Sequence, residues 1–274
     1  MGSAVPAESE KRDRRSPYFS HALGDALRDL TEKRLLELVK TEPVPTHLAI
    51  IMDGNRRFAT EAGLDVNTGH TRGRDTLEEL LDWCLEIGIK ILTVYALSTE
   101  NFSRSKEELD GLMELFDKAL RDIAVDERVH RHQIRVRAIG DRKALPARVQ
   151  EAIAIAEAAT AGYDRYQYNV ALAYGGRDEI VEAIRVLARE VRAGRLDPEQ
   201  IDSQAVASHL YTADLPDPDL IFRTSGEERI SNFLLWQSAY SELYFSDVYW
   251  PGLTRTEFLR AIRSFQLRRR RFGA

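Results

Sequence analysis

Apolar residues along the chain alternate between short continuous runs and longer stretches with helical spacing. The short runs predict buried strands, because a strand covered on both faces needs successive apolar residues, and the longer stretches predict amphipathic helices. The predicted strands cover 48–52, 91–97, 134–139, 168–174 and 220–222, and the predicted helices cover 71–87, 106–123, 146–161 and 178–192. This order indicates an α/β fold with a mostly parallel sheet flanked by helices.

The first 46 residues form an N-terminal extension with a different pattern. Residues 1–16 are polar and rich in charge, which predicts disorder. From Tyr18 to Lys40 the apolar residues recur at helical spacing, and the prolines of Glu42–Pro45 end this predicted amphipathic helix. Its charges are mixed and not mainly basic, so packing on the following domain, residues 47–274, is favoured over binding to a membrane surface.

Composition narrows the class of protein. With 274 residues, 43% of them hydrophobic, the chain can build one large domain or two small ones. The longest aliphatic run, Leu48–Met52, is far shorter than the roughly 20 residues of a membrane helix, and no signal-peptide pattern is present. Lone Cys84 lies near an apolar helix stripe, which predicts a buried thiol and fits a reducing cytoplasm.

Charge points to the kind of ligand. The net charge of −5 argues against non-specific binding of nucleic acid. Of the 39 basic residues, 32 are arginine and only 7 are lysine. Because the guanidinium group binds phosphate as a planar fork, the positions of the arginines matter more than the total charge.

The most informative arginines follow the predicted strands, where parallel sheets bind their ligands. Asp53 ends the first strand and is followed by Gly54, Asn55, Arg56 and Arg57. Such a turn can aim backbone N–H groups at a diphosphate, and Asp53 is suited to hold magnesium (Mg²⁺) against it. A plain Asp-Gly turn with solvated arginines is the alternative, and this motif alone does not decide between them.

Two further strand ends add a second anion clamp. The second strand is followed by Glu100, Asn101 and Arg104, and the last apolar run is followed by Arg223, Arg229 and Ser231. A Walker loop is absent, and Ile51 stands where an aspartyl-phosphate hydrolase would carry its nucleophile. The pattern predicts an enzyme that handles two phosphorylated substrates without a covalent intermediate.

Five motifs together resemble those of the cis-prenyltransferases, which are the undecaprenyl and dehydrodolichyl diphosphate synthases. The motifs appear in order at Met52–Ala59, Gly69–Gly73, Tyr95–Phe102, Arg223–Gln237 and Glu242–Phe245, and the similarity extends from about residue 47 to residue 273. The Arg-Arg-Phe sequence at residues 56–58 resembles the corresponding sequence of archaeal and eukaryotic members.

The resemblance implies one domain with a six-stranded sheet and an apolar tunnel, usually as a homodimer. Such an enzyme condenses an allylic diphosphate, farnesyl or geranylgeranyl, with successive isopentenyl diphosphates. Each new double bond is Z, and the product is an undecaprenyl-like polyprenyl diphosphate that serves as a glycosyl carrier lipid. A non-catalytic partner subunit of the same fold is the alternative, although such subunits typically lose the Asp and Arg residues that this chain keeps.

The resemblance also assigns roles to residues. Asp53 is the essential carboxylate associated with Mg²⁺, and Glu242 is a second metal ligand contributed across the dimer interface. Asn101 matches a proposed proton acceptor; because a neutral amide is a poor base, we expect it to orient the isopentenyl group while a diphosphate oxygen takes the proton. The other implied substrate-site residues are Gly54, Asn55, Arg56, Arg57, Phe58, His70, Ser98, Thr99, Glu100, Phe102, Arg104, Arg223, Arg229, Ile230, Ser231 and Arg271 of the C-terminal arm.

Two positions qualify this assignment. Val66 stands where many members carry an arginine, so Arg56, Arg72 or Arg74 would have to replace that phosphate contact. One helix carries an apolar stripe that could line a tunnel or simply pack in the core, formed by Leu109, Leu112, Met113, Phe116 and Leu120. A long product held in a tunnel would leave slowly, so we expect a cytoplasmic enzyme that visits the membrane surface to unload.

Overall fold

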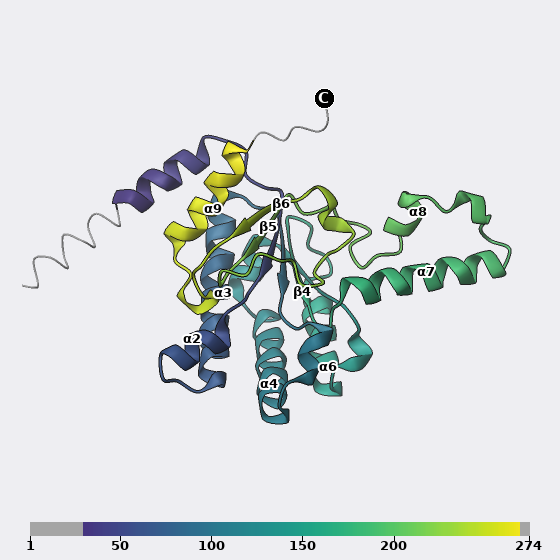
Figure 1. Ribbon diagram of the computed structural model, residues 1–274, viewed down its shortest axis with the longest axis horizontal. Coiled ribbons are helices and arrows are strands. Elements are labelled where there is room, and N and C mark those ends of the chain that lie inside the picture. The colour runs from purple at the N-terminus through teal and green to yellow at the C-terminus, as the bar shows by residue number, and fades with distance from the viewer. Residues whose placement is uncertain (1–29, 269–274) are drawn as a thin grey trace, which may run out of the picture.

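A six-stranded, all-parallel sheet forms the centre of residues 30–268, the part of the chain that this computed structural model describes (Figure 1). The strand order is β3-β4-β2-β1-β5-β6. The bounds are β1 His47–Ile51, β2 Ile91–Tyr95, β3 Ile134–Ile139, β4 Tyr166–Ala171, β5 Leu220–Arg223 and β6 Glu242–Phe245. The predicted α/β class is therefore confirmed, and every strand pair is parallel.

Helices connect the strands and cover the sheet. The longer ones are α3 Val66–Ile87, α4 Lys106–Ile123, α6 Ala147–Thr160, α7 Gly176–Arg192 and α9 Arg255–Leu267. The shorter ones are α2 Asn55–Glu61, α5 Glu127–His132 and α8 Ser203–Ala207. Among the described helices, the structure shows none long and apolar enough to cross a membrane.

Most predicted elements are confirmed, with local shifts that have identifiable causes. Helix α4 has the predicted bounds, whereas α3 begins five residues earlier than predicted, because the Asp65 side chain caps it by accepting a 2.9 Å hydrogen bond from the Thr68 amide. The strand predicted over 168–174 lies at Tyr166–Ala171, since the backbone at Ala173 turns to a positive φ of 50° and leaves the ladder.

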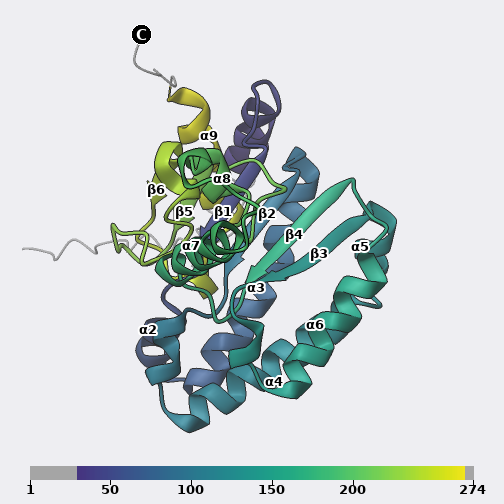
Figure 2. The same ribbon diagram turned by 90° about the vertical axis from the view of Figure 1, so that its right-hand side faces the viewer.

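Successive strand residues feed two separate cores. In β1, Leu48 and Ile50 join the larger core, which α3, α4, α6 and α9 complete. Ala49 and Ile51 face the opposite side, where a smaller core contains Tyr174 and Phe233. Figure 2 shows the helices α3, α4 and α6 together on one side of the sheet.

The N-terminal extension is described only in part. Residues 30–40 are helical, and this segment contacts α9 through Glu32, which pairs with Arg255 at 2.9 Å. The disorder predicted for residues 1–16 and the first part of the predicted helix lie outside the described residues. Cys84 is buried, and burial raises the pKa of its thiol, as expected for a structural cysteine.

Candidate active site

Two adjoining pockets open at the carboxyl ends of the strands. One has a volume of about 490 Å³ and is lined by the segment from Asp53 to Arg57. The other has a volume of about 470 Å³ and is lined by Asn101, Arg223 and Ser231, among others. The pockets share Met52, Asp53, Asn55, His70 and Arg104. The two anion clamps predicted from separate parts of the sequence therefore meet at Asp53.

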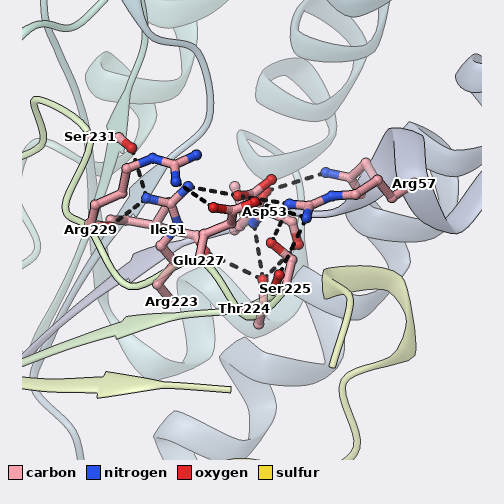
Figure 3. A network of polar contacts seen from close by, with 11 residues as sticks. Ile51, Asp53, Arg57, Arg223, Thr224, Ser225, Glu227, Arg229 and Ser231 are labelled. Carbon is pink, nitrogen blue, oxygen red and sulfur yellow. Dashed lines mark hydrogen bonds and ion pairs between the residues drawn. The ribbon is translucent and has the colours of Figure 1, made fainter. Parts of the chain in front are cut away.

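Asp53 lies between two arginines (Figure 3). Its Oδ2 atom is 2.7 Å from a terminal nitrogen of Arg223 and 3.3 Å from one of Arg57. Burial alone would raise the pKa of this carboxyl group, but the Arg223 hydrogen bond and the two positive charges outweigh burial and hold the pKa below its usual value. Asp53 is therefore ionised at neutral pH.

The loop after β5 holds Arg223 in place. Arg223 is only 4% exposed, and it donates hydrogen bonds to the carbonyl oxygen of Arg229 and, at 2.7 Å, to Ser231 Oγ. The backbone folds tightly around it, because Ser225 and Ser231 both adopt positive φ angles, 78° and 47°. The loop thus builds a pre-positioned cation at the floor of the second pocket.

Two residues of this predicted clamp do not line either pocket. The Arg229 guanidinium group pairs with Glu227 and is 61% exposed, while its backbone carbonyl holds Arg223. Ile230 packs against the smaller core. Arg57 also pairs with Glu227, at 3.1 Å, so one carboxylate holds an arginine from each anion clamp.

The first clamp depends on a glycine at the strand end. Gly54 has φ 104°, and a Cβ atom there would lie 2.8 Å from Tyr249, so α2 can begin directly behind Asp53 only with glycine at this place. Arg56 is 60% exposed at the edge of the pocket, where an anion can reach it. Phe58 lies against Arg72, with 5.7 Å between the guanidinium carbon and the ring centroid.

Glu108 is a site residue that sequence reasoning missed. It is buried on the first turn of α4, where its carboxylate lies 2.8 Å from Arg104, 3.2 Å from His70 and 3.8 Å from Arg56. Burial lowers the pKa of His70, and the Arg104 charge lowers it further, although the hydrogen bond to Glu108 opposes this. The spacing of four residues between Arg104 and Glu108 was a usable signal for an ion pair, although Arg104 itself lies just before α4, whose N-cap is Ser105.

The end of β2 forms a short turn that presents several predicted residues. Ser98 and Asn101 cap each other. The backbone N–H of Asn101 donates to Ser98 Oγ at 3.2 Å, and the backbone N–H of Ser98 donates to the Asn101 side-chain oxygen at 3.0 Å. That oxygen thus already accepts one hydrogen bond, and the NH₂ group of Asn101 is a donor that a substrate oxygen can use. Asn232 donates to Glu100 at 3.0 Å, Thr99 donates to Asp178, and Phe102 packs on the larger core.

Glu242 is not brought near Asp53 within one chain. It begins β6 opposite Leu220, three residues before the pair formed by Arg223 and Phe245, which places it about 10 Å back along the strands. Its carboxylate pairs with Arg268 at 2.9 Å. Arg271 lies outside the described residues.

Asp53 is suited to bind a magnesium ion whose other ligands come mainly from the substrate. The described residues contain no cluster of three or more carboxylate, histidine or cysteine ligands. Mg²⁺ typically binds one or two carboxylates together with phosphate oxygens, and an ionised Asp53 at the junction of two anion pockets offers that kind of ligand.

The structure narrows the candidates for the contact missing at Val66. Val66 is the first residue of α3 and lines neither pocket. Of the three arginines considered as replacements, only Arg56 lines the first pocket. Arg72 is engaged with Phe58, and Arg74 pairs with Asp75 at 3.0 Å.

An apolar cavity of about 100 Å³ leads away from the junction of the two pockets, between α3, α4 and the sheet. Met52, Asn55 and His70 border both this cavity and the two anion pockets. Of the predicted apolar stripe on α4, Phe116 and Leu120 line the cavity, Leu112 lines the second anion pocket, and Met113 packs in the core. The stripe is therefore part wall and part core, and a continuous tunnel remains a prediction.

Fold and site together define an α/β protein with two adjoining pockets suited to anions, and comparisons with known proteins identify its family. Residues 51–273 match the family model described as putative undecaprenyl diphosphate synthase. The chain belongs to this cis-prenyltransferase family.

Archaeal relatives are similar over nearly the whole chain. A protein from Methanopyrus kandleri is 56% identical over 242 residues, covering 88% of this chain and 89% of that protein. One from Thermoplasma acidophilum is 52% identical over 254 residues, covering 93% and 98%. Both are named tritrans,polycis-undecaprenyl-diphosphate synthase (geranylgeranyl-diphosphate specific). The alternative of a non-catalytic subunit is thereby disfavoured.

Solved structures agree with this family. Lavandulyl diphosphate synthase from Lavandula x intermedia, in complex with dimethylallyl diphosphate, aligns with a TM-score of 0.81 and 40% identity, covering 84% of this chain and 99% of that one. A probable undecaprenyl diphosphate synthase from Campylobacter jejuni aligns with a TM-score of 0.68 and 37% identity, covering 85% and 100%.

Proposed function

We propose that this enzyme extends geranylgeranyl diphosphate with successive isopentenyl diphosphates in Z geometry, to give an undecaprenyl-like polyprenyl diphosphate. The observation that carries this proposal is the meeting of two anion pockets and an apolar cavity at Asp53 and Met52. The geranylgeranyl primer, rather than farnesyl, is favoured by the names of the archaeal relatives.

The two substrates would occupy the two pockets. The allylic diphosphate binds beside Gly54, Asn55 and Arg56, with its hydrocarbon tail in the apolar cavity. Isopentenyl diphosphate binds beside Arg223 and Ser231, and the free NH₂ group of Asn101 orients it. Arg57, Arg104 and Glu108 hold the surrounding charges in fixed positions.

Charge on the leaving diphosphate is what the site must stabilise. As the bond between the allylic carbon and the diphosphate breaks, the isopentenyl double bond attacks that carbon, and a proton then passes to a diphosphate oxygen. Pre-positioned arginine side chains favour this charge separation because they need no reorganisation during the step. When bound at Asp53, Mg²⁺ supplies further stabilisation of the negative charge on the leaving diphosphate.

We infer that the active form is a homodimer that brings Glu242 to the partner's site. Apolar side chains are exposed near Glu242 and on the outward-running helix α7 (Figure 1): Leu243 is 36% exposed, Tyr240 79%, Val181 43% and Ile184 53%. A second copy of this chain would cover them. Light scattering of wild type and of Ile184→Glu tests this, with a dimer expected for the first and a monomer for the second.

We further infer that the product leaves at a membrane surface. Each five-carbon isoprene unit buried in the apolar cavity adds roughly 3–4 kcal/mol to product retention, at about 0.8 kcal/mol per CH₂ group, so release should limit turnover. A burst of condensation followed by a slower phase that detergent accelerates is expected. A linear time course that detergent does not change would contradict this inference.

The decisive experiment uses the purified protein with Mg²⁺ and radiolabelled isopentenyl diphosphate. Geranylgeranyl and farnesyl diphosphate are supplied in parallel, and product chains are separated by chromatography. We expect long Z-prenyl products, formed with a higher kcat/KM from the geranylgeranyl primer. Absence of elongation from either primer would overturn the proposed function, and a preference for farnesyl diphosphate would overturn the primer assignment alone.

A further inference from the structure

A second apolar cavity continues the first one away from the active site. It also has a volume of about 100 Å³, and both cavities are lined by Arg74, Leu77, Ala119, Ile123 and Tyr168. The second cavity reaches Leu81 and Leu85 on α3, Val129 on α5 and Ile134 on β3. Together they form a corridor of two lobes along the inner face of α3.

This corridor is too small for the product of the proposed function. A volume of about 100 Å³ has room for only a few water molecules, far less than a polyprenyl chain needs. The corridor must therefore widen as the chain grows. The sheet side is formed by well-buried residues such as Ile134 and Tyr168, so widening there would disrupt the larger core.

The outer side of the second lobe is held by charge. Arg128 of α5 bonds to Asp126, the residue that caps its own helix, at 2.7 Å. The same guanidinium group reaches across to α3, where it lies 3.4 Å from Asp82 and 3.6 Å from Glu78. The four side chains line the lobe and are between 25% and 54% exposed.

Exposed ion pairs of this kind are individually weak, but here three carboxylates share the Arg128 guanidinium group, and this network holds α5 against α3. An apolar chain end that reaches the bridge also displaces water from its charged groups. The chain offers these groups no hydrogen bonds in return, so the contact costs free energy. Growth of the chain therefore becomes unfavourable when it arrives at the Arg128 bridge.

We propose that the Arg128 bridge between α5 and α3 closes the far end of the corridor and sets the length of the prenyl product. This inference rests on the proposed function, because it assumes that the corridor holds the growing chain. Arg128 acts as a residue that determines product length through the width of the corridor, away from the reacting carbons.

The test compares the products of wild type, Arg128→Ala and a matched control, Arg131→Ala. Arg131 lies on the same helix, is 69% exposed and pairs only with Glu127 of that helix among the ion pairs of the described residues. We expect Arg128→Ala to lengthen the main product by at least one isoprene unit while the rate of the first condensation stays within about twofold of wild type. The Arg131→Ala products should match those of wild type.

Salt and a second variant provide independent readouts. At about 1 M NaCl, where the screening length falls to about 3 Å, the wild-type product should lengthen and the Arg128→Ala product should not change further. Glu78→Gln combined with Asp82→Asn removes the α3 side of the bridge and should lengthen the product in the same way. This variant serves if Arg128→Ala fails to fold.

The outcomes separate the two proposals. Products of unchanged length from a folded bridge variant, with a normal first condensation, would overturn the role of Arg128 and leave the proposed function intact. Equal lengthening in Arg131→Ala would also overturn it, since the effect would then follow from any lost charge on α5. A wild-type chain that elongates no primer would overturn the proposed function and this inference with it.

Discussion

Arg223 shows how a single buried charge organises this site. A guanidinium group that is 4% exposed is costly unless its donors are paired, and here Asp53, Ser231 and the Arg229 carbonyl oxygen accept hydrogen bonds from its terminal nitrogens, while its buried Nε has no hydrogen-bond partner among the described residues. The carboxylate of Asp53 gains from the same contact, since the Arg223 hydrogen bond contributes to its lowered pKa. The geometry of the binding site and the local stability of the protein therefore both depend on the ion pair between Arg223 and Asp53.

Asp53→Ala should abolish turnover and also weaken the fold slightly. Loss of a carboxylate associated with the metal and the leaving group should lower kcat by more than about a hundredfold, a loss of several kcal/mol at the transition state. Because Arg223 loses its buried partner, the free energy of unfolding should fall by about 1–3 kcal/mol. A radiolabelled condensation assay and urea unfolding measure the two effects, and more than a tenth of wild-type activity would contradict the assigned role.

Glu108→Gln should act on substrate binding more than on the chemical step. The carboxylate holds Arg104 and His70 from a buried position, so the neutral amide would leave these groups less well placed for a diphosphate. We expect KM for the allylic diphosphate to rise about tenfold, with a smaller change in kcat. The exposed neighbour Glu107→Gln serves as the control, and equal effects of the two variants would contradict a positioning role for Glu108.

At the scale of elements, the packing of α2 against α3 places the first anion clamp. A Cβ atom at Gly69 would lie 2.6 Å from the Asn55 carbonyl oxygen, and one at Gly73 would lie 2.2 Å from Asn55 Oδ1. The two glycines are one turn apart on α3, so they form a smooth face on which the start of α2 rests. The Trp250 indole N–H donates to the Gly73 carbonyl at 2.7 Å and holds the same junction from the other side.

Gly69→Ala should therefore destabilise the protein, whereas Gly162→Ala should not. The added methyl group at residue 69 meets backbone that cannot move without shifting α2, which should cost about 1–3 kcal/mol of unfolding free energy. At Gly162 nothing lies within 4 Å of the added atom, so we expect a change of less than about 0.5 kcal/mol. Chemical denaturation measures both, and a Gly69→Ala protein as stable as wild type would show that the helices can separate freely.

At the scale of the whole molecule, the two faces of the sheet serve different purposes. The larger core lies on the face that carries the apolar corridor. The other face contains a buried polar chain that joins three strands: Asn169 donates to Thr93 Oγ1 at 3.0 Å, Thr93 lies 2.8 Å from His47 Nε2, and His47 Nδ1 lies 2.7 Å from the Pro216 carbonyl oxygen. Because the carbonyl oxygen can only accept, Nδ1 must carry a proton. In a neutral ring Nε2 then accepts a hydrogen bond from the Thr93 hydroxyl group.

This chain of hydrogen bonds predicts a loss of stability in acid. Burial lowers the pKa of His47, although the Pro216 carbonyl and the charge of Asp219 oppose this. In the unfolded state the imidazole has its ordinary pKa of 6.5, so as pH falls it binds a proton at a higher pH than in the folded state. Proton binding therefore lowers the free energy of the unfolded state first, and the free energy of unfolding decreases. Stability from His47 is complete above that value and declines below it.

Urea unfolding at about pH 8 and about pH 5.5 measures this dependence. His47→Gln should lose part of it, because glutamine does not titrate, while the exposed control His209→Gln should keep it. A wild-type protein and a His47→Gln protein with the same decline in acid would show that other groups cause the effect.

The amino-acid sequence by itself determined the class of fold, the strands β1 to β5 and the positions of the polar motifs. Apolar runs and helical spacing are local properties, and the rule that ligands bind at the carboxyl ends of parallel strands converted them into a site. The apolar pattern did not predict β6, because Glu242–Phe245 is short and only partly buried at the edge of the sheet. The tertiary structure alone decided which residues of each motif reach the pockets. It turned the Arg229 side chain toward Glu227 through the path of one loop, which no local pattern encodes. It also joined His70 to Glu108 and separated Glu242 from Asp53, because these relations link segments far apart in the chain.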